Sequence, residues 1–232
     1  MTPYYEQSGM TIYHGDCLDV MECWEGLRTQ PFDLLLTDPP YGLNEAAGKN
    51  KSRGGPFGGK KYSAGSVIVP ATDYGHASWD AAPANEAISV ARALARWAVI
   101  FGGNYYDLPP SRCWLVWDKD NSGDFADCEL LWTNFNKAVR KLTYRWNGML
   151  QQPGRPKEIR EHPTQKPEAV VVWALGHAPI ASRTVFDPFM GTGTTLVAAK
   201  RLGKQATGIE REERYCEIAA RRLRQEALPL EL

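Results

Sequence analysis

The chain has 232 residues, with 27 basic and 27 acidic side chains and a formal net charge of zero. A hydrophobic fraction of 43% is enough for a substantial core, and the length suits one large domain. A neutral chain lacks the overall positive charge that attracts nucleic acid, so any such site must be local. Five cysteines without a Cys-x-x-Cys pair argue against a disulfide framework and against a zinc site, and no metal is expected.

The amino-terminal third reads as short strands around one helix. Residues 11–13 suit a strand, and Asp16 suits the N-cap of the helix that follows. Residues 32–37 are mostly apolar, as in a strand that is covered on both faces of a parallel sheet. Neither a secretory signal nor an apolar run long enough for a bilayer is present, which predicts a cytoplasmic protein without membrane contact.

An Asp-Pro-Pro-Tyr run, residues 38–41, follows that strand directly, where ligands bind in such sheets. Pro39 excludes helical geometry at Asp38, so the chain leaves the sheet extended and stiff. The Asp38 carboxylate and the Pro39 carbonyl then offer acceptors for an amino group, and Tyr41 offers a ring for stacking. An arbitrary Asp-Pro-Pro is more often a plain strand-exit turn, but the tyrosine directly after it and a second motif far along the chain favour a ligand site.

Residues 42–66 form a long, glycine-rich loop with five basic residues and one acidic residue. A loop of this length in a compact domain is usually functional or disordered. It is predicted to be a flexible arm that contacts phosphates, with a solvated linker as the equal alternative. The basic residues are Lys49, Lys51, Arg53, Lys60 and Lys61.

The middle of the chain alternates a helix with strands. Residues 83–96 suit a helix, and residues 97–101, 113–117 and 129–133 suit strands. The following segment, residues 136–160, combines positive charge with aromatic rings, as in a surface that contacts bases and phosphates or in a solvated face beside core aromatics. Its basic residues include Arg140, Lys141 and Arg145.

The last third contains a second motif. A polar loop at 162–167 opens a helix, and a strand at 184–186 leads into a glycine loop, a helix, the strand 205–209 and Glu210. Strand, glycine loop, helix, strand and acid is an arrangement that holds a nucleoside, with the acid on the ribose hydroxyls. Asp187 would suit a cationic group. S-adenosylmethionine (SAM) contains both parts.

Together the two motifs resemble the DNA amino-methyltransferases that place the catalytic motif before the cofactor motif. The resemblance implies one α/β domain over residues 1–232, Rossmann-like, with a mostly parallel seven-stranded sheet and helices on both faces. Strand 11–13 would lie beside 205–209, and strand 183–186 beside 32–37. Residues 42–66 and 136–160 are then the segments left for target recognition.

The resemblance also implies roles for individual residues. The catalytic residues would be Asp38, Pro39, Pro40 and Tyr41. Cofactor binding would involve Asp16, Cys17, Asp38, Thr164, Gln165, Lys166, Asp187, Pro188, Phe189, Gly191, Gly193, Thr194 and Glu210. DNA would contact Trp117, Lys119, Arg140, Lys141 and Arg145 in addition to the five basic residues of the 42–66 loop.

The implied reaction is SAM-dependent transfer of a methyl group to N6 of adenine in double-stranded DNA, after the base is flipped out. Methylation of cytosine N4 is the alternative, and adenine is favoured because Asp38 stands where cytosine enzymes more often have Ser. A noncatalytic nucleic-acid-binding module and a methyltransferase acting on protein glutamine are weaker alternatives. Attack by a cysteine nucleophile is disfavoured because no cysteine lies in a Pro-Cys context. A homodimer is left open.

Overall fold

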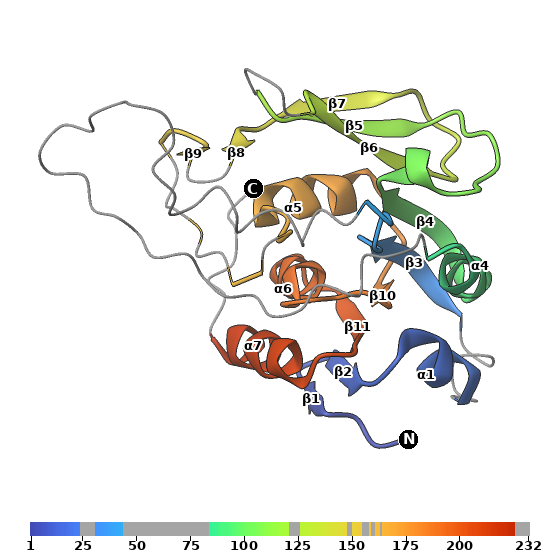
Figure 1. The fold of residues 1–232 in the computed structure, drawn as a ribbon, viewed down its shortest axis with the longest axis vertical. Coiled ribbons are helices and arrows are strands. Elements are labelled where there is room, and N and C mark those ends of the chain that lie inside the picture. The colour runs from blue at the N-terminus through green and yellow to red at the C-terminus, as the bar shows by residue number, and fades with distance from the viewer. Residues whose placement is uncertain are drawn as a thin grey trace, which may run out of the picture.

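The computed structural model describes residues 1–23, 31–43, 84–120, 126–147, 150–154, 158, 161–162 and 164–225. Nine strands of these residues form one mixed sheet in the order β1-β2-β11-β10-β3-β4-β6-β5-β7 (Figure 1). The strands are β1 (Tyr5–Gln7), β2 (Met10–His14), β3 (Phe32–Thr37), β4 (Ala95–Phe101), β5 (Trp114–Asp118), β6 (Cys128–Thr133), β7 (Arg140–Thr143), β10 (Thr184–Asp187) and β11 (Gln205–Glu210), with β8 (Trp146–Asn147) and β9 (Leu150–Gln151) paired separately.

Both predicted pairings of distant strands are confirmed. β2 pairs in parallel with β11, with Ile12 opposite Gly208, and β10 pairs in parallel with β3, with Phe186 opposite Leu35. β4 continues the parallel arrangement on the other side of β3. The strand ends that carry the two sequence motifs therefore meet at one edge of the sheet.

The predicted number of seven strands is wrong, because the sheet has nine. β1 was not predicted; a tight turn with positive φ at Ser8 and Gly9 folds it back antiparallel onto β2. β7 lies within the predicted recognition segment 136–160, yet it pairs in parallel with β5 at the far edge of the sheet. The strand was not predicted because Leu142 is its only half-buried apolar side chain and its basic residues are exposed.

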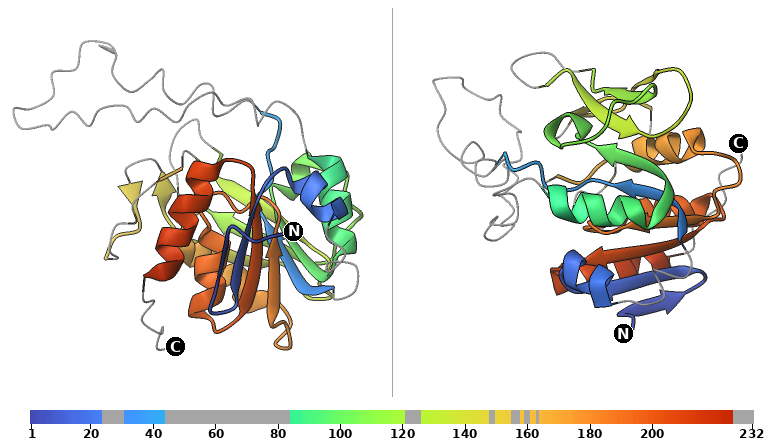
Figure 2. Two further views of the ribbon diagram at one scale, coloured as in Figure 1. Left: turned by 90° about the horizontal axis from the view of Figure 1, so that it is seen from below. Right: turned by 90° about the vertical axis from the view of Figure 1, so that its right-hand side faces the viewer.

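Helices cover both faces of the sheet. α5 (Glu168–His177), α6 (Thr194–Arg201) and α7 (Glu213–Arg224) pack on one face, whereas α1 (Cys17–Cys23) and α4 (Asn85–Ala93) pack on the other (Figure 2). β3 is buried on both sides, since Leu34 and Leu36 belong to one core cluster and Leu35 to the other. The sequence pattern of a fully covered strand is confirmed.

The helix positions agree with the sequence to within a few residues at their ends. α4 ends earlier than predicted, and β4 begins at Ala95 rather than at Trp97. Asp16 caps α1 as expected, because its Oδ1 accepts a hydrogen bond from the Leu18 amide at 2.9 Å. Within the part of the chain described, none of the helices combines the length and apolar character needed to cross a membrane.

Candidate active site

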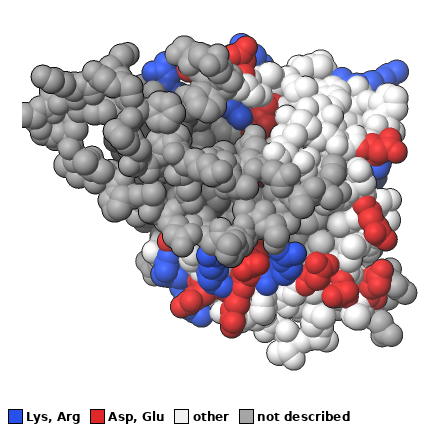
Figure 3. Space-filling view, in the orientation of Figure 1, with Lys and Arg blue, Asp and Glu red and all other residues white. Residues whose placement is uncertain are grey.

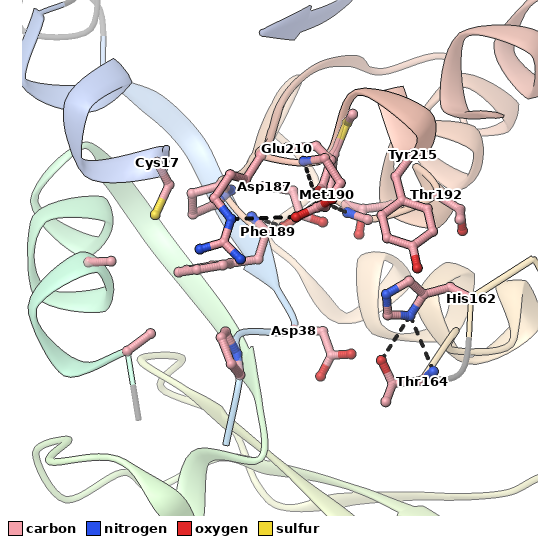
Figure 4. A pocket seen from close by; sticks show the side chains of 18 of the residues that line it. Cys17, Asp38, His162, Thr164, Asp187, Phe189, Met190, Thr192, Glu210 and Tyr215 are labelled. Atoms are coloured by element: carbon pink, nitrogen blue, oxygen red, sulfur yellow. Dashed lines mark hydrogen bonds and ion pairs between the residues drawn. The ribbon is translucent and has the colours of Figure 1, made fainter. Parts of the chain in front are cut away.

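A cavity of about 400 Å³ opens at the carboxyl edge of the sheet (Figure 4). Its walls come from the loops after β2, β3 and β10, the end of β11, the start of α4 and the loop before α5. Of the predicted cofactor residues, twelve line the cavity: Asp16, Cys17, Asp38, Thr164, Gln165, Lys166, Asp187, Pro188, Phe189, Gly191, Thr194 and Glu210. The structure thus brings together residues that lie in five separate parts of the sequence.

Gly193 is the predicted cofactor residue that does not line the cavity. It adopts φ +77° immediately before α6, and a Cβ placed there would lie 2.7 Å from the Cβ of Ala219 on α7. The glycine is needed for the turn and for close packing of the two helices. The structure gives Gly193 this packing role, and its contact with the cofactor stays a prediction.

Asp187, at the end of β10, is a buried carboxylate beside the cavity, with 2% of its surface exposed. Its Oδ1 accepts hydrogen bonds from the Thr37 hydroxyl at 2.7 Å and from the Phe189 amide at 3.1 Å. Burial nevertheless dominates and raises the pKa of Asp187 to about 6. An approaching cation would restore the charged form.

Glu210, at the end of β11, is held by the backbone. Its Oε2 accepts a hydrogen bond from the Gly191 amide at 3.0 Å, and its Oε1 accepts one from the Glu212 amide at 2.7 Å. Burial raises the pKa of this carboxyl as well. The carboxylate is fixed against the glycine loop and still has unused lone pairs for hydroxyl donors.

Two groups of residues form opposite sides of the cavity in Figure 4, with Cys17 on one side and His162 on the other. Burial raises the pKa of the Cys17 thiol to about 12, so the thiol stays protonated. His162 Nδ1 lies 3.2 Å from the Thr164 amide and 3.0 Å from its hydroxyl, and the imidazole meets the Tyr215 ring edge-on at 4.6 Å. Tyr215, on α7, also lines the cavity and was not among the predicted site residues.

Asp38 belongs to a compact cluster with Tyr41, Lys166 and Glu129, which we call the Asp38 cluster. Lys166 Nζ lies 2.8 Å from Asp38 Oδ2 and 3.0 Å from Glu129 Oε1. The Tyr41 hydroxyl lies 2.7 Å from Asp38 Oδ1 and 2.6 Å from Glu129 Oε1. Lys119 closes the outer side of the cluster, 3.0 Å from Glu129 Oε2.

Glu129 was missed by sequence reasoning, although a signal was present. It is the acidic residue near the start of an otherwise apolar strand, and its side chain is 9% exposed. β6 runs antiparallel to β4, so the first residues of β6 lie at the edge where the parallel strands end. A buried carboxylate at such a position destabilises the fold unless cations pair with it, and here two lysines do.

The charged groups of the Asp38 cluster shift one another's pKa values. Burial raises the pKa of Asp38, and the negative charge of Glu129 adds to the increase while Lys166 opposes it. Burial alone would raise the pKa of Glu129, but Lys166 and Lys119 outweigh it and lower that pKa to about 2. The two carboxylates raise the pKa of Lys166 despite its burial, so the ammonium remains charged. Burial also raises the pKa of Tyr41, which keeps its proton.

The catalytic turn is more enclosed than its sequence suggested. The Pro39 carbonyl, predicted to be open to an amino group, already accepts a hydrogen bond from the Tyr106 hydroxyl at 2.8 Å. The Tyr41 ring stacks on Tyr105 at 5.0 Å and packs against Gly102, where a Cβ would lie 2.4 Å from the ring. Neither Pro39 nor Tyr41 lines the cavity, whereas Asp38 and Pro40 do.

The predicted DNA-contacting residues are scattered in the structure. Trp117 is a correction, because its ring is 1% exposed in the core and its Nε1 donates to the Tyr144 carbonyl at 2.9 Å. Lys141 pairs with Asp118 at 2.9 Å, and Arg145 pairs with Asp120. On the face seen in Figure 3, the described basic and acidic side chains mostly lie next to one another. Lys49, Lys51, Arg53, Lys60 and Lys61 lie outside the described residues.

Comparison with known proteins gives consistent matches. A family model described as a DNA methylase, N6_N4_Mtase, matches residues 109–221. The Type II methyltransferase M2.LlaDCHI of Lactococcus lactis subsp. cremoris is 26% identical over 266 residues, which cover 95% of this chain and 91% of that relative. The chain is therefore similar to DNA amino-methyltransferases over almost its whole length.

Solved structures of DNA methyltransferases share the fold of this chain. The M1.HpyAVI–SAM complex has a TM-score of 0.54 and 21% sequence identity, covering 93% of this chain and 100% of that chain. The PvuII DNA methyltransferase, which is cytosine-N4-specific, has a TM-score of 0.55 and 14% identity, covering 97% of this chain and 90% of that chain. The chain therefore has the α/β fold of SAM-dependent DNA methyltransferases, as the sequence predicted.

Proposed function

We propose that this DNA methyltransferase transfers the methyl group of SAM to the exocyclic N6 of adenine in double-stranded DNA, after the target base has been flipped out of the helix. One observation carries the proposal. Asp38, which can receive an amino group, and the acids Asp187 and Glu210, which suit the two ends of SAM, line one cavity. The reacting groups would meet there.

The residues of the cavity fit SAM. Its volume of about 400 Å³ lies within the range of roughly 300–1,000 Å³ typical of small-molecule sites. Glu210, fixed by two backbone amides, would accept hydrogen bonds from the ribose hydroxyls. Asp187, whose pKa burial raises, would gain from an ammonium or sulfonium charge. The side chains of Phe189 and Cys17 provide apolar surface for the adenine.

Bound SAM would supply an electrophilic methyl group. Asp38 would accept a hydrogen bond from the target amino group and orient the nitrogen lone pair toward the methyl carbon. A nitrogen–carbon bond would form as the methyl–sulfur bond breaks, and the positively charged amine would then lose its extra proton to solvent water. The work of the protein would be positioning and stabilisation of the positive charge that develops on the amine. The anionic form of Asp38 suits both tasks.

Adenine is preferred over cytosine because of the residue type at Asp38. The fold does not discriminate between the two bases, because the cytosine-N4-specific PvuII enzyme shares it. Methylation of cytosine N4 therefore remains the second candidate, since a cytosine amino group could occupy the same place beside Asp38. A direct analysis of the product distinguishes the two.

We further propose that segments 42–66 and 136–160, together with the end of β5, contact DNA. Support comes from position, since Lys119 follows β5 at the same edge of the sheet as Asp38 and pairs with a residue of the Asp38 cluster. Arg145 follows β7 at that edge, where Thr143 lies opposite Asp118. Arg140, opposite Leu115, lies toward the other end of β7. The phosphate contacts would fix the position of the duplex.

The proposal is tested by incubating the protein with methyl-labelled SAM and unmethylated genomic DNA, followed by digestion to nucleosides. N6-methyladenine is the expected product. A product containing only N4-methylcytosine would overturn the adenine assignment, and DNA without label would overturn the activity. A parallel incubation with single-stranded DNA tests the preference for a duplex.

A further inference from the structure

Glu129 shares the Tyr41 hydroxyl and the Lys166 ammonium with Asp38, yet the mechanism above gives it no task. The hydroxyl has one proton and lies 2.7 Å from Asp38 Oδ1 and 2.6 Å from Glu129 Oε1. Both distances are those of hydrogen bonds, but one proton can serve only one acceptor at a time. The Tyr41 hydroxyl can therefore donate its hydrogen bond to either of the two carboxylates.

Lys166 is shared in the same way. Its Nζ lies 2.8 Å from Asp38 Oδ2, 3.0 Å from Glu129 Oε1 and 3.2 Å from the Tyr41 oxygen, so three neighbours match the three protons of the ammonium. With 12% of its side chain exposed, Lys166 has little access to water. Loss of Glu129 would leave Asp38 as the sole carboxylate partner of Lys166 within the cluster.

Lys119 keeps Glu129 in this position. It binds Glu129 Oε2 at 3.0 Å, so that Oε1 faces Tyr41 and Lys166. Lys166 and Lys119 together balance the charges of the two carboxylates, Asp38 and Glu129. The carboxylate of Glu129 therefore stays ionised and available as an acceptor.

We propose that Glu129 is a positioning residue for Asp38. Because Glu129 accepts one hydrogen bond from the Tyr41 hydroxyl and one from Lys166, Asp38 remains able to accept a hydrogen bond from the amino group of the target base. The inference rests on the proposed methyl transfer. Without Glu129, both protons would be directed to Asp38, and a carboxylate already engaged by two donors is a weaker acceptor for a third. Glu129 would act through Tyr41 and Lys166 without touching the substrate.

The test compares the wild type with Glu129→Gln, using labelled SAM and unmethylated genomic DNA. Turnover should fall roughly ten- to hundredfold, as expected for loss of a charged hydrogen bond, while the calorimetric affinity for SAM alone stays unchanged. The pH profile should also move. Turnover needs ionised Asp38 and rises with pH through its pKa; removal of the Glu129 charge lowers that pKa, so the acidic limb should shift to lower pH.

Asp33→Asn is the matched structural control. Asp33 lies near the start of β3, the strand that leads to Asp38. Its Oδ2 accepts hydrogen bonds from the Arg183 and Thr184 amides at 2.7 and 2.9 Å. This substitution removes one half-exposed charge at the end of β3 that is remote from Asp38. It should lower the melting temperature without moving the acidic limb.

Two results would overturn the proposal. In the first, Glu129→Gln has the turnover and the acidic limb of the wild type. In the second, Glu129→Gln resembles Asp33→Asn, with a lower melting temperature and an acidic limb that does not move. Glu129→Asp provides the test if the Gln variant fails to fold, because it keeps the charge but shortens the reach. At least tenfold lower turnover with unchanged SAM affinity supports the role, and full turnover contradicts it. Failure of the wild type to methylate any DNA would instead overturn the proposed function.

Discussion

The Asp38 carboxylate is expected to be needed for methyl transfer but not for folding. Asp38→Ala is expected to lower turnover by roughly a hundredfold or more, because the variant loses the acceptor that orients the amine. The fold should persist, since Lys166 keeps Glu129 as a partner at 3.0 Å. Labelled methyl transfer measures the first effect and thermal unfolding the second. Near-full turnover with a normal melting curve would exclude Asp38 as the acceptor.

Asp187 is a residue at which stability and binding are expected to conflict. Its pKa is raised to about 6 in the folded protein from an ordinary value near 4, so the folded state binds the proton more tightly. Stability is therefore full below about pH 4 and falls as pH rises through 6, by up to about 3 kcal/mol. Asp187→Asn should raise the melting temperature at pH 8 and have little effect on it near pH 4.

The same substitution should sharply weaken SAM binding, because an amide gives no charge to a cationic ligand. Calorimetry at pH 8 measures this effect. A variant that gains no stability at pH 8 would show that the buried carboxylate carries no cost. A variant that binds SAM normally would show that the charge is not used.

At the scale of elements, the junction between the glycine loop and α6 depends on Gly193. Gly193→Ala combines a left-handed backbone at φ +77° with a contact of 2.7 Å to Ala219, and should lower the free energy of unfolding by about 2 kcal/mol or more. Gly191→Ala is the control, because φ is +53° but the space around it is open; about 1 kcal/mol is expected. Urea unfolding of both variants gives the comparison. Equal losses would exclude the packing contribution.

The region after β7 provides a second test at this scale. Arg145→Ser is expected to weaken DNA binding and to reduce the slope of log affinity against log salt by about one, as for the loss of one phosphate contact. Arg140→Ser should have a smaller effect, since Arg140 lies toward the far end of the strand. Binding is measured on several unrelated duplexes at a series of salt concentrations. An unchanged slope for Arg145→Ser would remove this region from the interface.

Elements with strong local patterns were predictable from the sequence. β3, β11 and the glycine loop were placed because apolar runs and turn residues mark their ends, and the pairing of β2 with β11 followed from the order of the motifs. β1 and β7 were not predicted, because a three-residue strand and a charged edge strand carry little hydrophobic signal. Side-chain partners such as Glu129 depend on tertiary packing, which leaves only a weak trace in the sequence.

For the whole molecule, ligand binding should be visible as stability. A ligand that binds only the folded state raises the melting temperature by mass action, so SAM should do so in the wild type. Glu210→Ala should need roughly ten- to hundredfold more SAM for the same increase, because a hydrogen bond to a charged group is lost. Melting curves over a range of SAM concentrations measure the difference. Identical curves would remove Glu210 from the cofactor site.

The pairing of β2 with β11 also has a consequence for synthesis on the ribosome. β2 emerges early, but its parallel partner is among the last strands to be made, with Ile12 opposite Gly208. β3 similarly finds β4 soon and β10 only much later. Pairings between distant segments form slowly, and open strand edges favour aggregation in the meantime. Since Asp187 and Glu210 complete the cavity, prematurely terminated chains would lack the cofactor site and could not methylate DNA.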